Sequence, residues 1–347
     1  MSSTTSDDIA SAAQLACLLE ASAPKPGNVS PGRHFHDTRY EDFLASAAAI
    51  GGAFARAGER PLGATILDAV AATSRWTRSN TNLGIVLLLA PLAHAAHEAC
   101  RENQDRRVRR KGEGEGEGGL EERRELADDG GRGGRGVERG QKAQGKERNP
   151  EQRGARGTAL REGLAHVLRS TTVRDAADVY EAIRIARPAG LGQVADEDVS
   201  SAPSVTLREA MALAAERDGI AREYATAFGT TFEVGAPALA RARRDRLSWD
   251  DAVVETYLTL LAATPDTHIA RKLGEAAAVD VCGRARATLE SGGVRTAAGR
   301  ESVALLDGQL RDERNSRNPG TTADLTAAAI YVVLLEELLQ PSPDGNH

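Results

Sequence analysis

The stretch from residue 80 to about residue 99 constrains the fold most strongly. Its first residues are small and polar, and the residues after them are almost all apolar. A helix that is apolar on every side is stable only when other elements surround it. We therefore expect a helix here, in the middle of the protein. The polar residues before it are Asn80, Thr81, Asn82, Leu83 and Gly84.

The start of this predicted helix is a candidate anion site. The first turn of a helix has free backbone N–H groups and the positive end of the helix dipole. Asn80, Thr81, Asn82 and Gly84 are therefore candidates to hold a phosphate. The simpler interpretation is an N-cap on a core helix.

The rest of the chain predicts an all-α fold. Hydrophobic residues make up 41% of the sequence and aromatic residues only 3%, so the core must consist mainly of Ala, Leu, Val and Ile. No segment alternates between polar and apolar residues as a half-buried strand would. We expect a multi-helix bundle of about a dozen helices, with convergent helix N-termini forming the site.

A low-complexity segment divides the sequence. Residues 101–157 contain repeated Glu-Gly and Arg-Gly tracts and very few apolar side chains. Such a segment cannot bury enough surface to fold, so we expect a disordered insertion. Residues 1–100 and 158–340 are then the N-terminal and C-terminal helical halves of one domain.

The net charge, the cysteine content and the length of the apolar runs exclude some classes of protein. The net charge of −6 argues against a surface that binds nucleic acid. Three cysteines without metal-binding spacing indicate a reduced, cytoplasmic protein. The strongly apolar run near residues 83–93 is too short to span a bilayer, and the polar N-terminus lacks the pattern of a signal peptide. A homodimer is compatible with these totals.

Two loops near the N-terminus carry further candidates. Two prolines give the segment 24–28 a fixed path, so it could present Lys25 and Asn28 to a ligand. It could equally be a plain connection between helices. His36 and Asp37 follow, and they could bind a metal or exchange protons near neutral pH.

The C-terminal half repeats the pattern of a polar helix start. If residues 266–272 are helical, His268 and Lys272 lie on one face, with Asp266 before them. Asp218 and Arg222 have the spacing of a surface ion pair. Three adjacent acids at 196–198 could hold Mg²⁺ or form a solvated loop. The last apolar helix starts with Gly320, Thr321, Thr322 and Asp324.

Taken together, these stretches resemble the triphosphoribosyl-dephospho-CoA synthase family. The likeness rests on five motifs in order, and it covers the chain apart from residues 101–157. The motifs are Pro24-Lys25-Pro26-Gly27-Asn28, His36-Asp37, Asn80-Thr81-Asn82-Leu83-Gly84, Asp266-Thr267-His268-Ile269 and Pro319-Gly320-Thr321-Thr322-Ala323-Asp324-Leu325.

The resemblance implies an Mg²⁺-dependent transferase. In that family ATP gives its 5-triphosphoribosyl group to the ribose 2′-hydroxyl of 3′-dephospho-CoA, and adenine leaves. The implied partners are therefore ATP and a CoA-like or other small acceptor. On this hypothesis Lys25 and the helix starts hold phosphates. Asp37 and Asp324 bind Mg²⁺ or stabilise the reacting carbon, and Asp266 and His268 exchange protons or act as ligands.

The sequence departs from the family pattern at two places. Asn82 and Leu83 stand where the family usually has His and Lys, and Gly320-Thr321-Thr322 replaces the usual Gly-Gly-Ser. These changes leave three alternatives open: a phosphoribosyl-type transferase with a different acceptor, a nucleotide hydrolase and a non-enzymatic nucleotide-binding protein. Adenine release with and without an acceptor distinguishes them.

Overall fold

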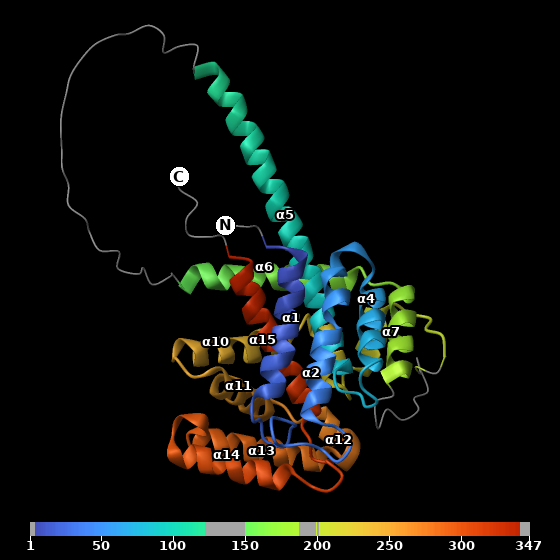
Figure 1. The fold of residues 1–347 in the computed structure, drawn as a ribbon, viewed down its shortest axis with the longest axis vertical. Coiled ribbons are helices and arrows are strands. Elements are labelled where there is room, and N and C mark those ends of the chain that lie inside the picture. Colours follow the sequence, from blue (N-terminus) through green and yellow to red (C-terminus); the bar gives the residue numbers. More distant parts are fainter. Residues whose placement is uncertain (1–3, 122–149, 187–198, 200, 341–347) are drawn as a thin grey trace, which may run out of the picture.

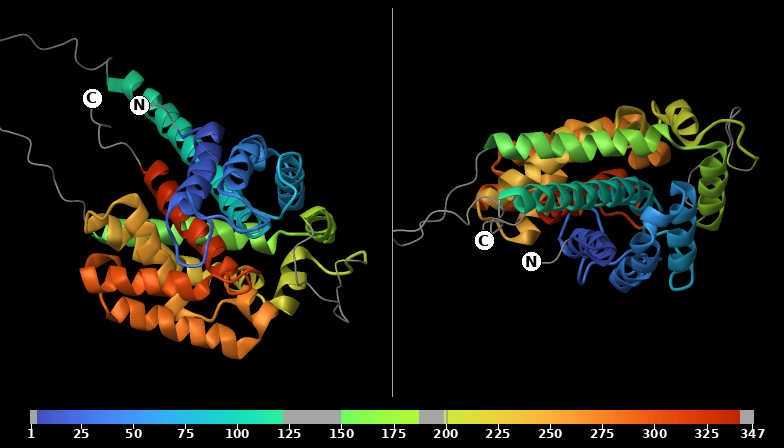
Figure 2. Two further views of the ribbon diagram at one scale, coloured as in Figure 1. Left: turned by 60° about the horizontal axis from the view of Figure 1, so that its bottom comes forward. Right: turned by 90° about the horizontal axis from the view of Figure 1, so that it is seen from above.

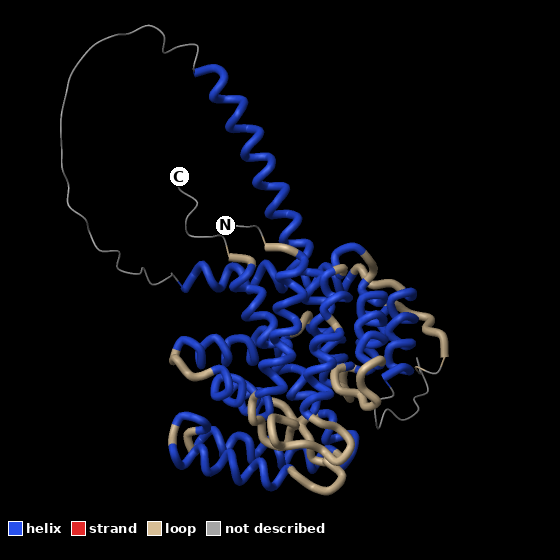
Figure 3. Tube along the Cα trace, viewed as in Figure 1, coloured by secondary structure: helices blue, strands red, loops and turns tan. Residues whose placement is uncertain are grey.

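The structure is helical throughout. A computed structural model describes residues 4–121, 150–186, 199 and 201–340. Every regular element in those ranges is a helix, and the nearest approach to a strand is an isolated antiparallel bridge between Ser30 and Arg33 (Figure 3). The predicted all-α fold is confirmed.

The first third of the chain forms α1 (Ser6–Ser22), α2 (Tyr40–Ala49), α3 (Gly51–Ala55), α4 (Leu62–Ser74) and α5 (Leu83–Glu121). The middle third forms α6 (Pro150–Arg169), α7 (Val173–Ala186), α8 (Leu207–Ala214), α9 (Gly219–Thr226) and α10 (Ala236–Arg244). The last third forms α11 (Trp249–Ala263), α12 (Thr267–Leu273), α13 (Glu275–Glu290), α14 (Ala297–Leu310) and α15 (Gly320–Leu338). Short 3₁₀ or π turns lie at Ala57–Glu59, Thr231–Gly235 and Gly293–Arg295.

Helix α15 and the first turns of α5 lie in the centre of the molecule, and the rest of α5 projects from the helical body (Figure 1). Seen from above, α5 lies between α6 and the N-terminal helices (Figure 2). Helix α15 packs on α1, α5, α10 and α11, and its side chains are buried almost without interruption. One buried cluster joins side chains from Ile9 to Leu335. The expected central position of the helix after Gly84 is confirmed.

A proline interrupts the hydrogen bonding of this central helix without ending it. Pro91 lies inside α5 and has no N–H, so the carbonyl of Leu87 lacks its usual partner. The hydroxyl of Tyr224 donates to that carbonyl at 2.7 Å. The contact joins α9 to the core helix and satisfies a buried backbone group.

The helices extend into the segment expected to be disordered. Helix α5 continues to Glu121 and α6 begins at Pro150, so the structure differs from the boundaries at 101 and 157. Residues 101–111 are rich in arginine, which has good helix propensity, whereas the glycines from Gly112 to Gly119 have poor propensity, so propensity accounts only for the first part of the extension of α5. Residues 122–149 lie outside the described residues.

One described segment passes a simple test for a membrane helix. Leu83–Glu102 is long and apolar enough by length and composition, contrary to the expectation for the run near 83–93. However, 72% of the apolar 18-residue stretch within this segment is buried inside the protein. A core helix passes the same test, so the segment is weak evidence for a membrane span.

Candidate active site

A cavity of about 660 Å³ lies where α5, α12 and α15 begin. This volume is in the range of sites for small molecules. Most of the sequence-predicted site residues line it, and they come from segments far apart in the chain. These residues are Asn28, Asp37, Asn80, Thr81, Asn82, Gly84, His268, Lys272, Gly320 and Asp324. Lys25, His36, Asp266, Thr321 and Thr322 lie elsewhere.

The carboxylate of Asp324 is held between two helix starts. It belongs to the first turns of α15, and it touches the start of α5, since a Cβ on Gly84 would overlap its Oδ2. None of the described residues donates a hydrogen bond to it. Burial raises its pKa well above the ordinary value, and the carboxylates of Glu20 and Asp266 add to the effect. The group is therefore a strong candidate for proton transfer or for binding a cation.

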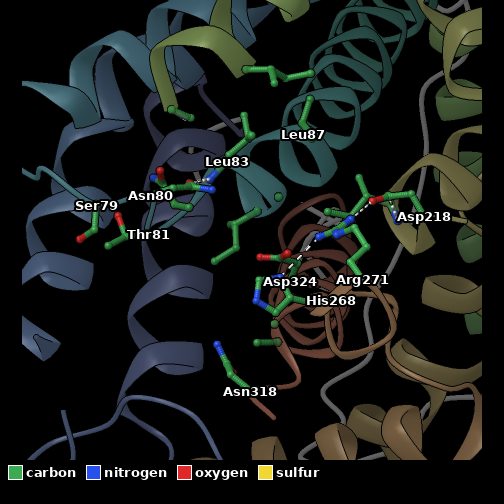
Figure 4. Close-up of a pocket in the computed structure, with 18 of the residues that line it drawn as sticks. Ser79, Asn80, Thr81, Leu83, Leu87, Asp218, His268, Arg271, Asn318 and Asp324 are labelled. Carbon is green, nitrogen blue, oxygen red and sulfur yellow. Dashed lines mark hydrogen bonds and ion pairs between the residues drawn. The ribbon is translucent and has the colours of Figure 1, made fainter. Parts of the chain in front are cut away.

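His268 lies beside Asp324 in the cavity (Figure 4). Burial lowers the pKa of His268 to about 3, and the positive charges of Lys272 and Arg271 contribute. The imidazole is therefore neutral at pH 7. An Arg271 N–H lies 3.4 Å from Nδ1, which assigns Nδ1 as the acceptor and leaves Nε2 as the donor by inference. A neutral donor of this kind can hydrogen-bond a leaving base.

The polar turn before α5 is built from its own side chains. The Asn80 side chain accepts a hydrogen bond from the Leu83 N–H at 3.0 Å, and Thr81 shares a hydrogen bond with Ser46. Asn82 turns inward and donates to Thr73 at 3.1 Å. The turn is therefore rigid. These residues shape the helix start, as the cap interpretation predicts, and they also line the cavity, where phosphate binding by them stays a prediction.

Helices α9, α12 and α15 begin at one point beneath the cavity. Thr267 accepts a hydrogen bond from the Gly219 N–H at 3.0 Å and shares another with Thr321, also at 3.0 Å. Asp266 accepts from the N–H and the hydroxyl of Thr322, both at 2.7 Å. The expected convergence of helix starts is present.

This network holds three predicted site residues away from the cavity. Both oxygens of Asp266 are used, because the second accepts from the N–H groups of His268 and Ile269. Thr321 and Thr322 are buried against the same network and do not line the cavity. Asp266, Thr321 and Thr322 therefore join helix starts and do not line this cavity, in contrast to the other site residues predicted from the same motifs. Gly320 does line the cavity and packs against His268.

Lys25 also differs from the expectation that it holds phosphate. It is only 1% exposed, and its ammonium group pairs with the Glu20 carboxylate at 3.0 Å and with backbone carbonyls. Lys25 lies inside the protein, next to Glu20, and Glu20 is part of the cavity wall. The two prolines fix the loop, as predicted, but the loop turns the lysine inward. Glu20, which sequence analysis missed, is the residue of this pair that lines the cavity.

The N-terminal loop supplies two further wall residues. Asn28 lines the cavity and donates to the Tyr257 hydroxyl at 2.9 Å. Asp37 lines it as well, whereas His36 is exposed and lies 3.2 Å from the Asn315 amide. The two side chains still lie near each other, with His36 Nδ1 3.8 Å from the Asp37 carboxylate, but no third His, Cys, Asp or Glu among the described residues joins them in a metal-binding group.

Several cations in the wall escaped sequence analysis. Arg78, Arg217, Arg271 and Arg314 line the cavity together with Lys272. Arg271 follows the Asp266-Thr267-His268-Ile269 motif within α12, whereas Arg78, Arg217 and Arg314 lie in loops that the fold brings together. Positive side chains of this number suit a polyphosphate.

Asp218 also differs from its predicted role. The sequence suggested an ion pair with Arg222, but Asp218 caps α9 through the Ile220 and Ala221 N–H groups. Its other oxygen pairs with Arg271. The arginine that interacts with His268 is therefore anchored by a carboxylate from another helix.

The carboxylates fit Mg²⁺ only as a partner of a bound polyphosphate. No group of three or more His, Cys, Asp or Glu residues able to hold a metal occurs in the described part of the chain. Mg²⁺ commonly binds one or two carboxylates together with substrate phosphates. Asp37 and Asp324 both line the cavity, and metal binding by either of them stays a prediction. The acids at 196–198 lie outside the described residues.

Comparisons with known proteins agree with this geometry. A family model described as ATP:dephospho-CoA triphosphoribosyl transferase matches residues 6–343. The chain is 33% identical over 113 residues to a probable 2-(5''-triphosphoribosyl)-3'-dephosphocoenzyme-A synthase of Stutzerimonas stutzeri, covering 32% of this chain and 38% of that protein. A relative of the same name from Pseudomonas fluorescens is 31% identical over 118 residues, covering 34% and 40%. The aligned region is thus about two fifths of these relatives' length.

A solved structure is similar along most of its length. It is a protein from Archaeoglobus fulgidus assigned as a triphosphoribosyl-dephospho-coA synthase. The TM-score is 0.54 at 27% sequence identity, and the match covers 84% of this chain and 98% of that one. The family match spans nearly the whole sequence, the structural match has the same architecture, and the cavity gathers the motifs. The chain therefore belongs to the ATP:dephospho-CoA triphosphoribosyl transferase family.

Proposed function

We propose that this protein transfers the 5-triphosphoribosyl group of ATP to the ribose 2′-hydroxyl of 3′-dephospho-CoA. The observation that supports this most is the position of Asp324 beside a neutral His268, in a cavity wall that carries several arginines. The reaction breaks the bond between adenine and C1′ and forms a bond from C1′ to the acceptor oxygen. A cationic, oxocarbenium-like state at C1′ needs a carboxylate nearby.

Each cavity residue has a role in this proposal. Arg271, Lys272 and Arg314 bind the triphosphate, because polyphosphates carry several negative charges that guanidinium and ammonium groups neutralise. The Asp324 carboxylate stabilises the cationic state at C1′ and accepts the proton that the 2′-hydroxyl loses as the C1′–O bond forms, and the departing adenine takes up a proton from solvent. The raised pKa of Asp324 makes it a better base than an ordinary aspartate. The Nε2–H of His268 donates a hydrogen bond to the departing adenine.

Mg²⁺ is the cofactor that we propose for this site. Asp37 would hold it together with phosphate oxygens, and it would neutralise charge on the triphosphate, while Asp324 acts at the reacting carbon. A cytoplasmic location is part of the same proposal, and three free thiols, Cys17, Cys100 and Cys282, support it. A homodimer remains a prediction, which light scattering of the purified chain would check.

The test is adenine release from ATP and Mg²⁺, measured with and without 3′-dephospho-CoA. The proposal predicts release only when the acceptor is present, with a product whose mass has increased by the triphosphoribosyl group. Release without acceptor would instead show a hydrolase. No release in either case, despite ATP binding, would contradict the transferase and favour a nucleotide-binding protein.

A further inference from the structure

The cavity has two chemically different parts. One part, around His268, carries Arg271 and Lys272. The other part is a wall made by α7 and α8, and it is apolar. We call this the α7–α8 wall, and its members used below are Ile183, Met211 and Leu213.

The side chains of this wall are unusually accessible for their type. Leu213 is 56% exposed, and Ile183 and Met211 are only half-buried. Apolar side chains that remain accessible on the wall of a cavity commonly mark a surface that a ligand covers. Methionine also suits an irregular, flexible ligand, because its side chain adapts to different shapes.

The wall is continuous with the reactive end of the cavity. Leu83 and Leu87, from the first turns of α5, line the cavity together with Asp324 (Figure 4). Helix α5 also contacts α7, and α7 packs on α8. A ligand that reaches from Asp324 along the first turns of α5 therefore arrives at the α7–α8 wall.

Only one of the two proposed substrates has a part that fits this wall. ATP consists of a base, a sugar and a charged triphosphate. Dephospho-CoA carries, beyond its adenosine diphosphate, an uncharged pantetheine arm with methyl and methylene groups. An uncharged, flexible arm is stabilised by apolar side chains and gains nothing from the arginines.

We propose that the α7–α8 wall is the subsite for the pantetheine arm of the acceptor. Resting on the proposed transferase function, this inference makes Met211 and Leu213 specificity residues, which select an acceptor with an arm and leave ATP binding unaffected. The adenosine end of the acceptor then lies toward Asp324, where its 2′-hydroxyl reacts.

The experiment compares two substrates on matched variants of the full chain. The test variant is Met211→Asn/Leu213→Asn, which is polar but uncharged and so does not repel phosphate. The control is Leu305→Asn, because Leu305 on α14 is 63% exposed and does not line the cavity. Calorimetry gives the Kd of 3′-dephospho-CoA and of ATP for each protein.

The expected result is a Kd for dephospho-CoA raised about tenfold in the double variant, as removal of apolar contacts in a pocket commonly gives. The Kd for ATP stays within about twofold of wild type, which also shows that the variant is folded. The control changes neither value. An unchanged Kd for dephospho-CoA, or equal weakening of both ligands, would overturn the inference.

The binding readout separates this inference from the function on which it rests. If wild type releases no adenine with any acceptor, the transferase proposal fails. The subsite for the pantetheine arm is then still tested by the two Kd values, because binding does not require turnover. A wild type that turns over normally with an unaffected double variant contradicts the subsite alone.

Discussion

At the scale of single residues, Asp324 occupies an electrostatically unfavourable place. It is partly exposed to the cavity, it receives no hydrogen bond from the described residues, and the carboxylates of Glu20 and Asp266 add to the rise of its pKa. A group that costs stability where it stands is commonly retained for activity. Sequence analysis could identify Asp324 from its motif, but its contact with Gly84 depends on the packing of two helices far apart in the chain.

Replacing Asp324 by asparagine should therefore stabilise the protein. The folded state holds the proton of this carboxyl above the pH at which an unfolded aspartate loses it, so Asp324 costs stability as pH rises. For Asp324→Asn without Mg²⁺ we expect the unfolding free energy at pH 8 to increase by about 1 to 2 kcal/mol. Urea unfolding at pH 8 and pH 5 measures this, and the gain should shrink at pH 5.

The matched control is Asp251→Asn, which should change stability in the opposite direction. The Arg300 side chain bonds to Asp251 and lowers its pKa. Its loss should cost less than about 1 kcal/mol, because the pair is partly exposed. A loss of stability at pH 8 in Asp324→Asn would show that the carboxylate is not under electrostatic stress.

A second prediction concerns the close approach at Gly84. A Cβ at this position would overlap the Asp324 carboxylate and also lie 2.7 Å from Ile220. Gly84→Ala should displace the carboxylate and reduce adenine release at least tenfold, while costing about 1 to 3 kcal/mol of stability. Activity assays and thermal melts measure the two effects.

Gly283→Ala is the control for the glycine variant. Gly283 lies inside α13, and nothing is within 4 Å of an added Cβ. Alanine has the higher helix propensity, so this variant should gain up to about 1 kcal/mol and retain full activity. Similar behaviour of the two alanine variants would refute the packing argument.

At the scale of elements, sequence patterns predicted where helices begin but not what each capping residue contacts. The apolar runs after Gly84 and Gly320 indicate buried helices, and small polar residues mark their starts. A one-dimensional pattern cannot tell whether a capping side chain faces a ligand or a neighbouring helix. Thus Asp266 joins α12 to α15, and Asp218 pairs with Arg271 in place of Arg222.

The link made by Asp266 gives the third prediction. Asp266→Ala would leave the N–H groups and the hydroxyl that it accepts from without partners inside the protein. We expect a loss of about 3 kcal/mol, because unpaired buried donors are costly. Asp266→Asn should lose less, since it keeps an acceptor oxygen. Denaturant titration distinguishes the variants.

Asp280→Ala provides the reference for a surface aspartate. Asp280 pairs with Arg284 one helical turn away, and its side chain is 50% exposed. Its replacement should cost less than about 0.5 kcal/mol. Equal losses at the two positions would mean that Asp266 does not hold the helix starts together.

At the scale of the whole molecule, the all-helical architecture could be read from the period and length of the apolar runs. The extents of α5 and α6 could not, because low complexity and helix formation are not exclusive. The arginine lining was also beyond sequence analysis. Arg78, Arg217 and Arg314 lie in separate loops, and only the folded chain brings them to one cavity.

Buried histidines predict how overall stability depends on pH. Burial lowers the pKa of His94 to about 4 and that of His268 to about 3. Below pH 6.5 the unfolded chain binds protons at these positions while the folded chain does not. The free energy of unfolding therefore decreases as the pH is lowered. We expect these two histidines to contribute a loss of about 3 kcal/mol between pH 6.5 and pH 4, after allowance for partial exposure, while Asp266 and Asp324, whose pKa values are raised, contribute in the opposite direction.

Denaturant unfolding across that range measures the loss, and His94→Gln tests its origin. Glutamine can still bond to Thr65, which lies 3.1 Å from the His94 Nε2, but it does not titrate. The variant should show a shallower decline on the acid side. An unchanged slope would assign the pH dependence to other groups.

The most direct test of the account is a single-turnover measurement of adenine release by Asp324→Asn. The assay uses saturating ATP, Mg²⁺ and 3′-dephospho-CoA, with Asp251→Asn as the control. We predict that wild type and control form the heavier product, and that Asp324→Asn binds ATP normally but reacts at least about a hundredfold more slowly. Product formed by Asp324→Asn at the wild-type rate would contradict the assignment of this cavity as the site of transfer.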